Sequence, residues 1–138
     1  MPVCVDASFV VRLLLGGEEA DRASARWAGW MNAGERVLAP ELMLAETTNA
    51  LHRCGQAGLL QPAEVDEAVR HVGALGIELS PMAPLVGPAL SLARRLALPA
   101  AYDAFYLALA ERESAELWTA DLRLTRAVSG VLPWVRSA

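Results

Sequence analysis

Short apolar segments alternate with longer helical segments along the whole chain, and this alternation limits the fold more than any other feature of the sequence. The apolar segments are only a few residues long, as buried strands are. Strands that alternate with helices predict an α/β fold, with a short, mostly parallel sheet flanked by helices on both faces. The predicted strands are Val3–Val5, Arg36–Ala39, Ile77–Leu79, Leu117–Thr119 and Val131–Val135.

Capping residues, glycines and prolines delimit the helices between these strands. Ser8 is a candidate N-cap for the first helix, Gly55 and Gly73 are expected to end the third and fourth, and Pro133 places the last strand at a sheet edge. Because the chain has 138 residues and no linker or repeat, we expect residues 1–138 to form a single domain. The predicted helices are Ser8–Leu15, Glu18–Ala33, Pro40–Arg53, Pro62–Val72, Pro84–Leu96, Ala101–Arg112 and Leu122–Val128.

The location and redox state of the chain also follow from its composition. No apolar run reaches the roughly 18 residues that span a bilayer, and the N-terminus lacks a signal-peptide pattern, so we expect a cytoplasmic protein. Cys4 and Cys54 are expected to be free thiols. No spacing of cysteine and histidine indicates a zinc site.

All twelve basic residues are arginine, and the absence of lysine excludes several classes of enzyme. A P-loop and a protein kinase each need a lysine on the nucleotide phosphates. Sixteen acidic residues outnumber the twelve arginines and give a net charge of −4, which disfavours broad electrostatic binding of nucleic acid. A nucleic-acid enzyme of this composition would need metal ions or local arginines to hold phosphates.

Several carboxylates stand where the surrounding sequence is apolar. Asp6 and Asp121 follow predicted strands, Asp103 lies near a helix N-terminus, and Glu46 lies inside a helix with Asn49 on the same face. Taken singly, Asp6 could cap a helix, Asp103 could favour a helix dipole, and Glu46 could face solvent. Because α/β sheets bind ligands at the carboxyl ends of their strands, the placement of all four together favours one acidic site.

Carboxylates that converge must either share protons or bind a cation. Two carboxylates about 4 Å apart repel each other by about 4 kcal/mol at an effective dielectric constant near 20. Oxygen ligands favour magnesium or manganese, and one or two such ions suit the cleavage of phosphodiesters. The sequence therefore predicts a metal-dependent site built from Asp6, Glu46, Asp103 and Asp121.

Four short segments resemble the PIN-domain nucleases, in particular the VapC-type toxins of prokaryotic toxin–antitoxin pairs. Each segment alone is a weak signal, but their order and spacing fit that family across nearly the whole chain. The segments are Val-Asp-Ala-Ser at 5–8, Ala-Glu-Thr-Thr-Asn-Ala-Leu at 45–51, Tyr-Asp-Ala-Phe-Tyr-Leu-Ala-Leu-Ala at 102–110 and Trp-Thr-Ala-Asp-Leu-Arg-Leu at 118–124.

The resemblance implies an endoribonuclease that uses Mg²⁺ or Mn²⁺, forms a homodimer and is neutralised by a small antitoxin protein. It maps the family's acidic positions, which are both catalytic and metal-binding, onto the four carboxylates named above. It also places Ser8, Asn49 and Thr119 at polar supporting positions. Contacts to the RNA backbone would fall to arginines, with Arg12, Arg123 and Arg126 as unranked candidates.

Alternative interpretations remain open at this point. The chain could be a non-catalytic PIN-like binding module, or an acid-cluster phosphatase that acts on small phosphate esters. His52 and His71 could serve a metal-free ribonuclease, although neither lies in a convincing motif. Trp27, Trp30 and Met31 form a stripe at helical spacing, which favours core packing over a groove for a partner helix.

Overall fold

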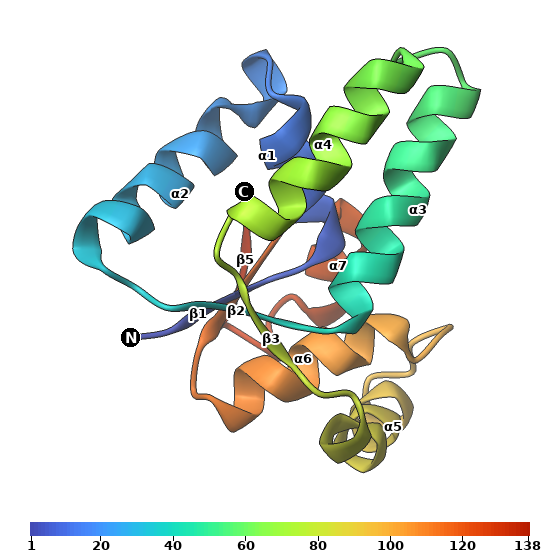
Figure 1. The fold of residues 1–138 in the computed structure, drawn as a ribbon. Helices are drawn as coiled ribbons and strands as arrows, with labels where there is room; N and C mark the ends of the chain where they lie inside the picture. The colour runs from blue at the N-terminus through green and yellow to red at the C-terminus, as the bar shows by residue number, and fades with distance from the viewer.

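The computed structural model describes residues 1–138 and has a five-stranded parallel sheet at its centre (Figure 1). The strands follow the order β3-β2-β1-β4-β5, and every neighbouring pair is parallel. The α/β fold expected from the alternating sequence is therefore confirmed. The strands are β1 (Val3–Val5), β2 (Val37–Pro40), β3 (Glu78–Ser80), β4 (Glu116–Thr119) and β5 (Val135–Ser137).

Helices cover both faces of this sheet (Figure 1). Helices α1 to α4 pack against one another on one face, and α6 packs on the other with α5 beneath it. The last helix, α7, lies beside β4 and β5. The helices are α1 (Ala7–Leu15), α2 (Asp21–Ala33), α3 (Leu42–Gln56), α4 (Pro62–Ala74), α5 (Val86–Arg95), α6 (Tyr102–Arg112) and α7 (Leu122–Val128).

The position of the last strand differs from the prediction. Val131 and Leu132 both donate backbone hydrogen bonds to the carbonyl of Val128, so this apolar stretch forms a turn after α7. The strand begins only at Val135, where the register pairs it with Leu117 of β4. The predicted edge position is correct, because β5 is the outermost strand on that side of the sheet.

Two predicted helix boundaries are also wrong. Pro40 is the last residue of β2, and α3 begins at Leu42. Gly55 does not end α3 but lies inside it, at a close approach to α4, where an added Cβ would lie 3.2 Å from the Cγ2 of Val65. Packing between the two helices requires a small residue at this position. The sequence pattern alone could not distinguish a glycine required by packing from a glycine that ends a helix.

An aromatic cluster joins α1 and α2 to the sheet. Trp30 lies between Phe9 and Trp118: its ring centroid is 5.4 Å from that of Phe9 and 5.8 Å from that of Trp118. Trp27 packs edge-on against Trp30, with the two ring centroids 6.3 Å apart. Core packing, the favoured interpretation of the tryptophan stripe, is therefore confirmed for Trp30, while Met31 is 43% exposed. Phe9 is fully buried, so α1 also contributes a large aromatic side chain to the core.

The remaining structural expectations concern thiols and membranes. Cys4 and Cys54 are both free, and Cys4 is buried in β1. No helix combines the length and the apolar composition that a membrane-spanning helix needs.

Candidate active site

Asp6 and Asp121 lie at the carboxyl ends of neighbouring strands. Asp6 directly follows β1, and its backbone N–H donates to the carbonyl oxygen of Trp118 in β4 at 3.3 Å. Asp121 lies two residues after the end of β4. Because Val5 and Trp118 are register partners, the sheet itself brings these two acids to one edge, as the sequence predicted.

Asp6 is held by hydrogen bonds on both carboxylate oxygens. Its Oδ1 accepts from the Ser8 hydroxyl at 2.6 Å and from the Phe9 backbone N–H at 2.9 Å, and its Oδ2 accepts from the Thr119 hydroxyl at 2.5 Å. Asp6 is therefore the N-cap of α1, and the prediction that Ser8 is the cap is wrong. The reason is that Ser8 already lies inside the helix, where its side chain faces the end of β4.

Burial dominates the ionisation of Asp6. The residue is 5% exposed, and desolvation raises the pKa of its carboxyl to about 6 despite the three hydrogen bonds that favour the charged form. The negative charge of Asp103 adds to this increase. An acid with a pKa near 6 is one that a cation could ionise fully at neutral pH.

Ser8 and Thr119 tie the two strand ends together. Ser8 Oγ accepts from the backbone N–H of Ala120 at 2.9 Å, and Thr119 Oγ1 accepts from the backbone N–H of Asp121 at 3.0 Å. Both hydroxyls also donate to Asp6. They therefore fix the orientation of Asp6.

Asp121 caps α7 and pairs with an arginine of the same turn. Its carboxylate accepts from the backbone N–H of Arg123 at 2.9 Å and forms an ion pair with the Arg123 guanidinium at 3.2 Å. Partial burial works to raise the pKa of Asp121, but the hydrogen bonds and charge of Arg123 outweigh it and hold the pKa below its usual value.

Glu46 reaches the site from α3. The Tyr106 hydroxyl of α6 donates to Glu46 Oε1 at 2.5 Å. Partial burial raises the pKa of Glu46, the bond from Tyr106 opposes that increase, and the charge of Asp103 adds to it. Tyr106 was missed by the sequence reasoning, although its position three residues after Asp103 puts both side chains on one face of α6.

Asp103 lies in the first turn of α6, and its carboxylate makes no hydrogen bond with another side chain. Burial raises the pKa of its carboxyl, the charge of Asp121 raises it further, and Arg123 acts in the opposite direction. Its ionisation therefore responds to the acids of the strand ends. This electrostatic coupling supports placing Asp103 in the same group as Asp6 and Asp121.

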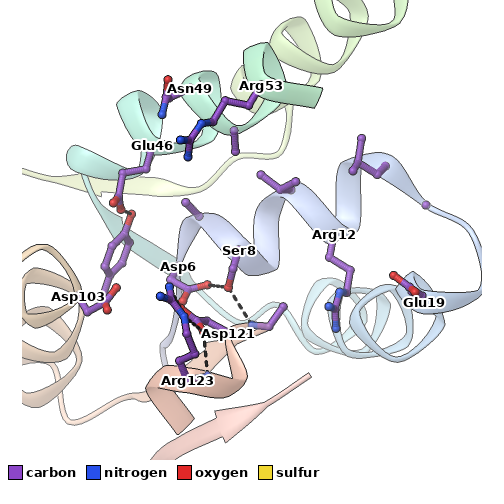
Figure 2. A pocket seen from close by; sticks show the side chains of 17 residues that line it. Asp6, Ser8, Arg12, Glu19, Glu46, Asn49, Arg53, Asp103, Asp121 and Arg123 are labelled. Atoms are coloured by element: carbon purple, nitrogen blue, oxygen red, sulfur yellow. Dashed lines mark hydrogen bonds and ion pairs between the residues drawn. The ribbon is translucent and has the colours of Figure 1, made fainter. Parts of the chain in front are cut away.

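All four predicted acids line one cavity of about 690 Å³ (Figure 2). Ser8 and Asn49 line it as well, whereas Thr119 is fully buried behind it. Arginines line the same cavity, but Arg126 does not. The cavity-lining arginines are Arg12 and Arg123, which the sequence suggested, and Arg53, which it did not.

The donor set suits magnesium or manganese, because all four side chains offer carboxylate oxygens. In this structure, however, no three acidic or histidine groups lie close enough to hold one ion together. Glu46 is bound to Tyr106 and Asp121 to Arg123 instead. By its chemistry the cavity fits a divalent cation, and the residues available to bind one are Asp6, Glu46, Asp103 and Asp121.

The histidine alternative finds no support in the geometry. His52 and His71 are both exposed, and neither lines the acidic cavity. His71 instead lies 3.9 Å from Glu67 on the same face of α4. These residues are placed as ordinary surface histidines.

Comparison with known proteins identifies the fold and the family. The chain is an α/β domain with acids gathered at adjoining strand ends, and the family model of the PIN domain matches residues 3–129. The chain therefore belongs to the PIN domain family. Within it, the chain resembles two proteins of Mycobacterium tuberculosis. Ribonuclease VapC3 is 37% identical over 125 residues, 91% of this chain and 86% of that protein. Ribonuclease VapC9 is 32% identical over 123 residues, 89% and 88% of the two chains.

Solved structures show the same fold. PAE2754 from Pyrobaculum aerophilum superposes with a TM-score of 0.70 at 25% identity, covering 94% of this chain and 81% of that one. A chain of a toxin–antitoxin complex from Klebsiella pneumoniae superposes with a TM-score of 0.68 at 19% identity, covering 97% and 95%. The predicted resemblance to VapC-type PIN domains is thus confirmed.

Proposed function

We propose that this chain is a metal-dependent endoribonuclease and the toxin of a type II toxin–antitoxin pair. The observation that carries the proposal is the convergence of Asp6, Glu46, Asp103 and Asp121, from four separate parts of the chain, on one cavity. Similarity to ribonucleases VapC3 and VapC9 over most of the chain supports RNA as the substrate.

The four acids would hold Mg²⁺ or Mn²⁺ in this proposal. When bound, such an ion activates water and stabilises negative charge on the leaving oxygen of a phosphodiester. Ser8 and Thr119 hold the Asp6 carboxylate in one orientation, and Tyr106 positions Glu46. Asn49 lies on the same face of α3 as Glu46 and offers a neutral polar group to the substrate.

The proposal also includes the partners and the setting of the protein. Residues 1–138 would act as a single PIN-like nuclease domain in the cytoplasm, as a homodimer bound by a cognate antitoxin. Leu15 of α1 and Met31 of α2 are 44% and 43% exposed, and apolar side chains exposed in this way are common at protein interfaces. An antitoxin arginine that entered the acidic cavity would compete with the metal for the carboxylates.

An assay with two substrates tests the activity. We expect the purified protein to cleave single-stranded RNA in Mn²⁺ or Mg²⁺ and to be inactive in excess chelator, with activity restored when the metal is returned. A small phosphate monoester should not be hydrolysed under the same conditions. Hydrolysis of the monoester without RNA cleavage would instead favour a phosphatase, and no activity on either would favour a binding module.

Expression in a bacterial host tests the toxin assignment. The chain alone should arrest growth, the Asp103→Asn variant should not, and co-expression of the neighbouring small gene should restore growth and yield a complex that co-purifies. Arrest by the wild-type chain requires an active site that reaches cellular RNA, so the variant is the matched control. A wild-type chain that is well expressed, harmless and monomeric by light scattering would contradict the toxin assignment even if the purified protein cleaves RNA.

A further inference from the structure

The acidic cavity continues beyond the carboxylates into a groove between α1 and α3. On α3, Glu46, Asn49, Ala50 and Arg53 are spaced so that they share one helix face, and all of them line the cavity. The cavity therefore runs along α3, from an acidic end at Glu46 to a basic end at Arg53. Helix α1, which packs against α3, forms the opposite side.

The α1 side of this groove is apolar, and an arginine lies on each side of α1. Ala7, Val11 and Leu15 recur at intervals of four along α1 and line the cavity. Figure 2 shows Arg12 and Arg53 on opposite sides of α1. An apolar strip with a guanidinium on each side suits a nucleotide, whose sugar and base are largely apolar on their faces and whose phosphate is charged.

The charges of Arg12 and Arg53 have no partner within the protein. Arg123, the third arginine that lines the cavity, forms an ion pair with Asp121. Neither Arg12 nor Arg53 makes an ion pair, and Glu19, which lines the cavity near Arg12, forms none with it. Elsewhere in the chain, four arginines pair with glutamates: Arg36 with Glu78, Arg95 with Glu111, Arg112 with Glu113 and Arg136 with Glu116. Five more arginines form no ion pair, so the distinction of Arg12 and Arg53 is that they are unpaired and also line the cavity.

The spacing along α3 separates the backbone of Arg53 from that of Glu46. The two residues are seven positions apart, which corresponds to about 10 Å along a helix. Figure 2 shows the Arg53 side chain extending back along α3 over the cavity, where its guanidinium is placed to meet a phosphate of a strand bound in the acidic site. Its planar fork can bind two phosphate oxygens at once, which makes arginine well suited to hold a nucleic-acid backbone.

We propose that Arg12 and Arg53, one on each side of α1, bind separate phosphates of single-stranded RNA near the scissile one, so that the strand reaches the acidic site across α1 and along the groove between α1 and α3. This inference rests on the proposed ribonuclease function and assigns the two arginines as substrate-positioning residues. Ala7, Val11 and Leu15 would contact the intervening nucleotide. Arg12 and Arg53 are the two cavity-lining arginines that form no ion pair within the protein.

Binding of an end-labelled, mixed-sequence single-stranded RNA, followed by fluorescence anisotropy, tests this proposal. The Asp103→Asn variant serves as the background, so that cleavage does not disturb the equilibrium. We expect Arg12→Gln and Arg53→Gln each to weaken binding by roughly five- to tenfold. Each should also lower the slope of the logarithm of affinity against the logarithm of salt concentration by roughly 0.7.

Arg126→Gln and Arg70→Gln are the matched controls, because they change the net charge equally but lie outside the cavity. They should leave affinity and salt slope within about twofold of the background. Arg12→Lys and Arg53→Lys should recover most of the binding, which a purely structural role would not explain. In cleavage assays with the native acids, Arg53→Gln should raise KM with little change in kcat.

Equal affinities and salt slopes for Arg53→Gln, Arg12→Gln and Arg126→Gln would overturn this inference. That result would leave the proposed function intact as long as the wild-type chain cleaves RNA in a metal-dependent manner. Conversely, an inactive wild-type chain whose RNA binding still depends on Arg12 and Arg53 would contradict the proposed function and support the groove. Thermal melting of each variant confirms that it is folded before it is compared.

Discussion

The Asp103→Asn variant is expected to lose RNA cleavage by about a thousandfold or more while keeping its fold. The substitution removes one of the negative charges that would hold the cation, and losing about 4 kcal/mol of transition-state stabilisation has this effect on rate. The Asp103 carboxylate makes no side-chain hydrogen bond, so its replacement by asparagine costs little stability. Single-turnover cleavage of labelled RNA measures the loss.

The same variant separates metal binding from folding. Mn²⁺ that binds only the folded protein should stabilise the wild type by about 2.7 kcal/mol at one hundred times its Kd, and Asp103→Asn should show a much smaller response. Thr119→Ala is the graded comparison, because it alters the support of Asp6 without removing a carboxylate. An Asp103→Asn protein that cleaves at the wild-type rate, with contaminating nuclease excluded, would show that the acidic cavity is not the active site.

The stability of the metal-free protein is expected to fall as pH rises from about 4 to about 6. Asp6 has an ordinary pKa of 3.8 when unfolded and about 6 when folded, so in this window the folded state binds more protons than the unfolded state. The contribution of Asp6 to the free energy of unfolding is therefore fully present below pH 4. This contribution is lost as pH rises through the pKa of Asp6 in the folded state. The difference corresponds to roughly 3 kcal/mol at most.

The Asp6→Asn variant should remove most of this dependence and melt at a higher temperature than the wild type at pH 7 in chelator. Asparagine keeps an acceptor for the Phe9 backbone N–H, so the cap of α1 survives. Glu46 and Asp103 also have raised pKa values and contribute in the same direction, so a shallow slope should remain. Chemical denaturation at several pH values measures it, and an unchanged slope in Asp6→Asn would contradict the assignment of this titration to Asp6.

Asp6→Ala is a poor substitute for this variant. Alanine would leave the Phe9 N–H and the hydroxyls of Ser8 and Thr119 without their acceptor. Loss of a buried hydrogen-bond acceptor and a helix cap costs on the order of 1 to 3 kcal/mol. A loss of activity in that variant would mix the loss of a carboxylate with a loss of structure.

Much of the fold could be predicted because strands and helices follow different sequence periods. β1 and α7 were placed correctly to the residue, and most other boundaries differ by one or two residues. The last strand was misplaced because the run from Val131 to Val135 is apolar, and an apolar run can form either a buried strand or a buried turn. Only the backbone bonds to Val128, which close a turn, distinguish them.

The acids of the site were easier to predict than the side chains that surround them. A charge in an apolar segment is visible in the sequence, so Asp6 and Asp103 stood out. Tyr106 lies in an equally apolar helix where a tyrosine is unremarkable, and its importance comes from Glu46, sixty residues away in the chain. Arg53 likewise gains its place in the cavity from how α3 lies against α1.

The acids rest on two kinds of support, and this difference makes the activity tunable from within the core. The spacing of Asp6 and Asp121 is set by hydrogen-bonded strands, which lie about 4.8 Å apart whatever side chains surround them. The positions of Glu46 and Asp103 depend instead on how α3 and α6 pack, through buried side chains such as Met43 and Leu107. Conservative changes at those two positions are expected to weaken or strengthen the proposed activity gradually, as a genetic circuit or an attenuated strain would require, without altering a single residue that lines the acidic cavity.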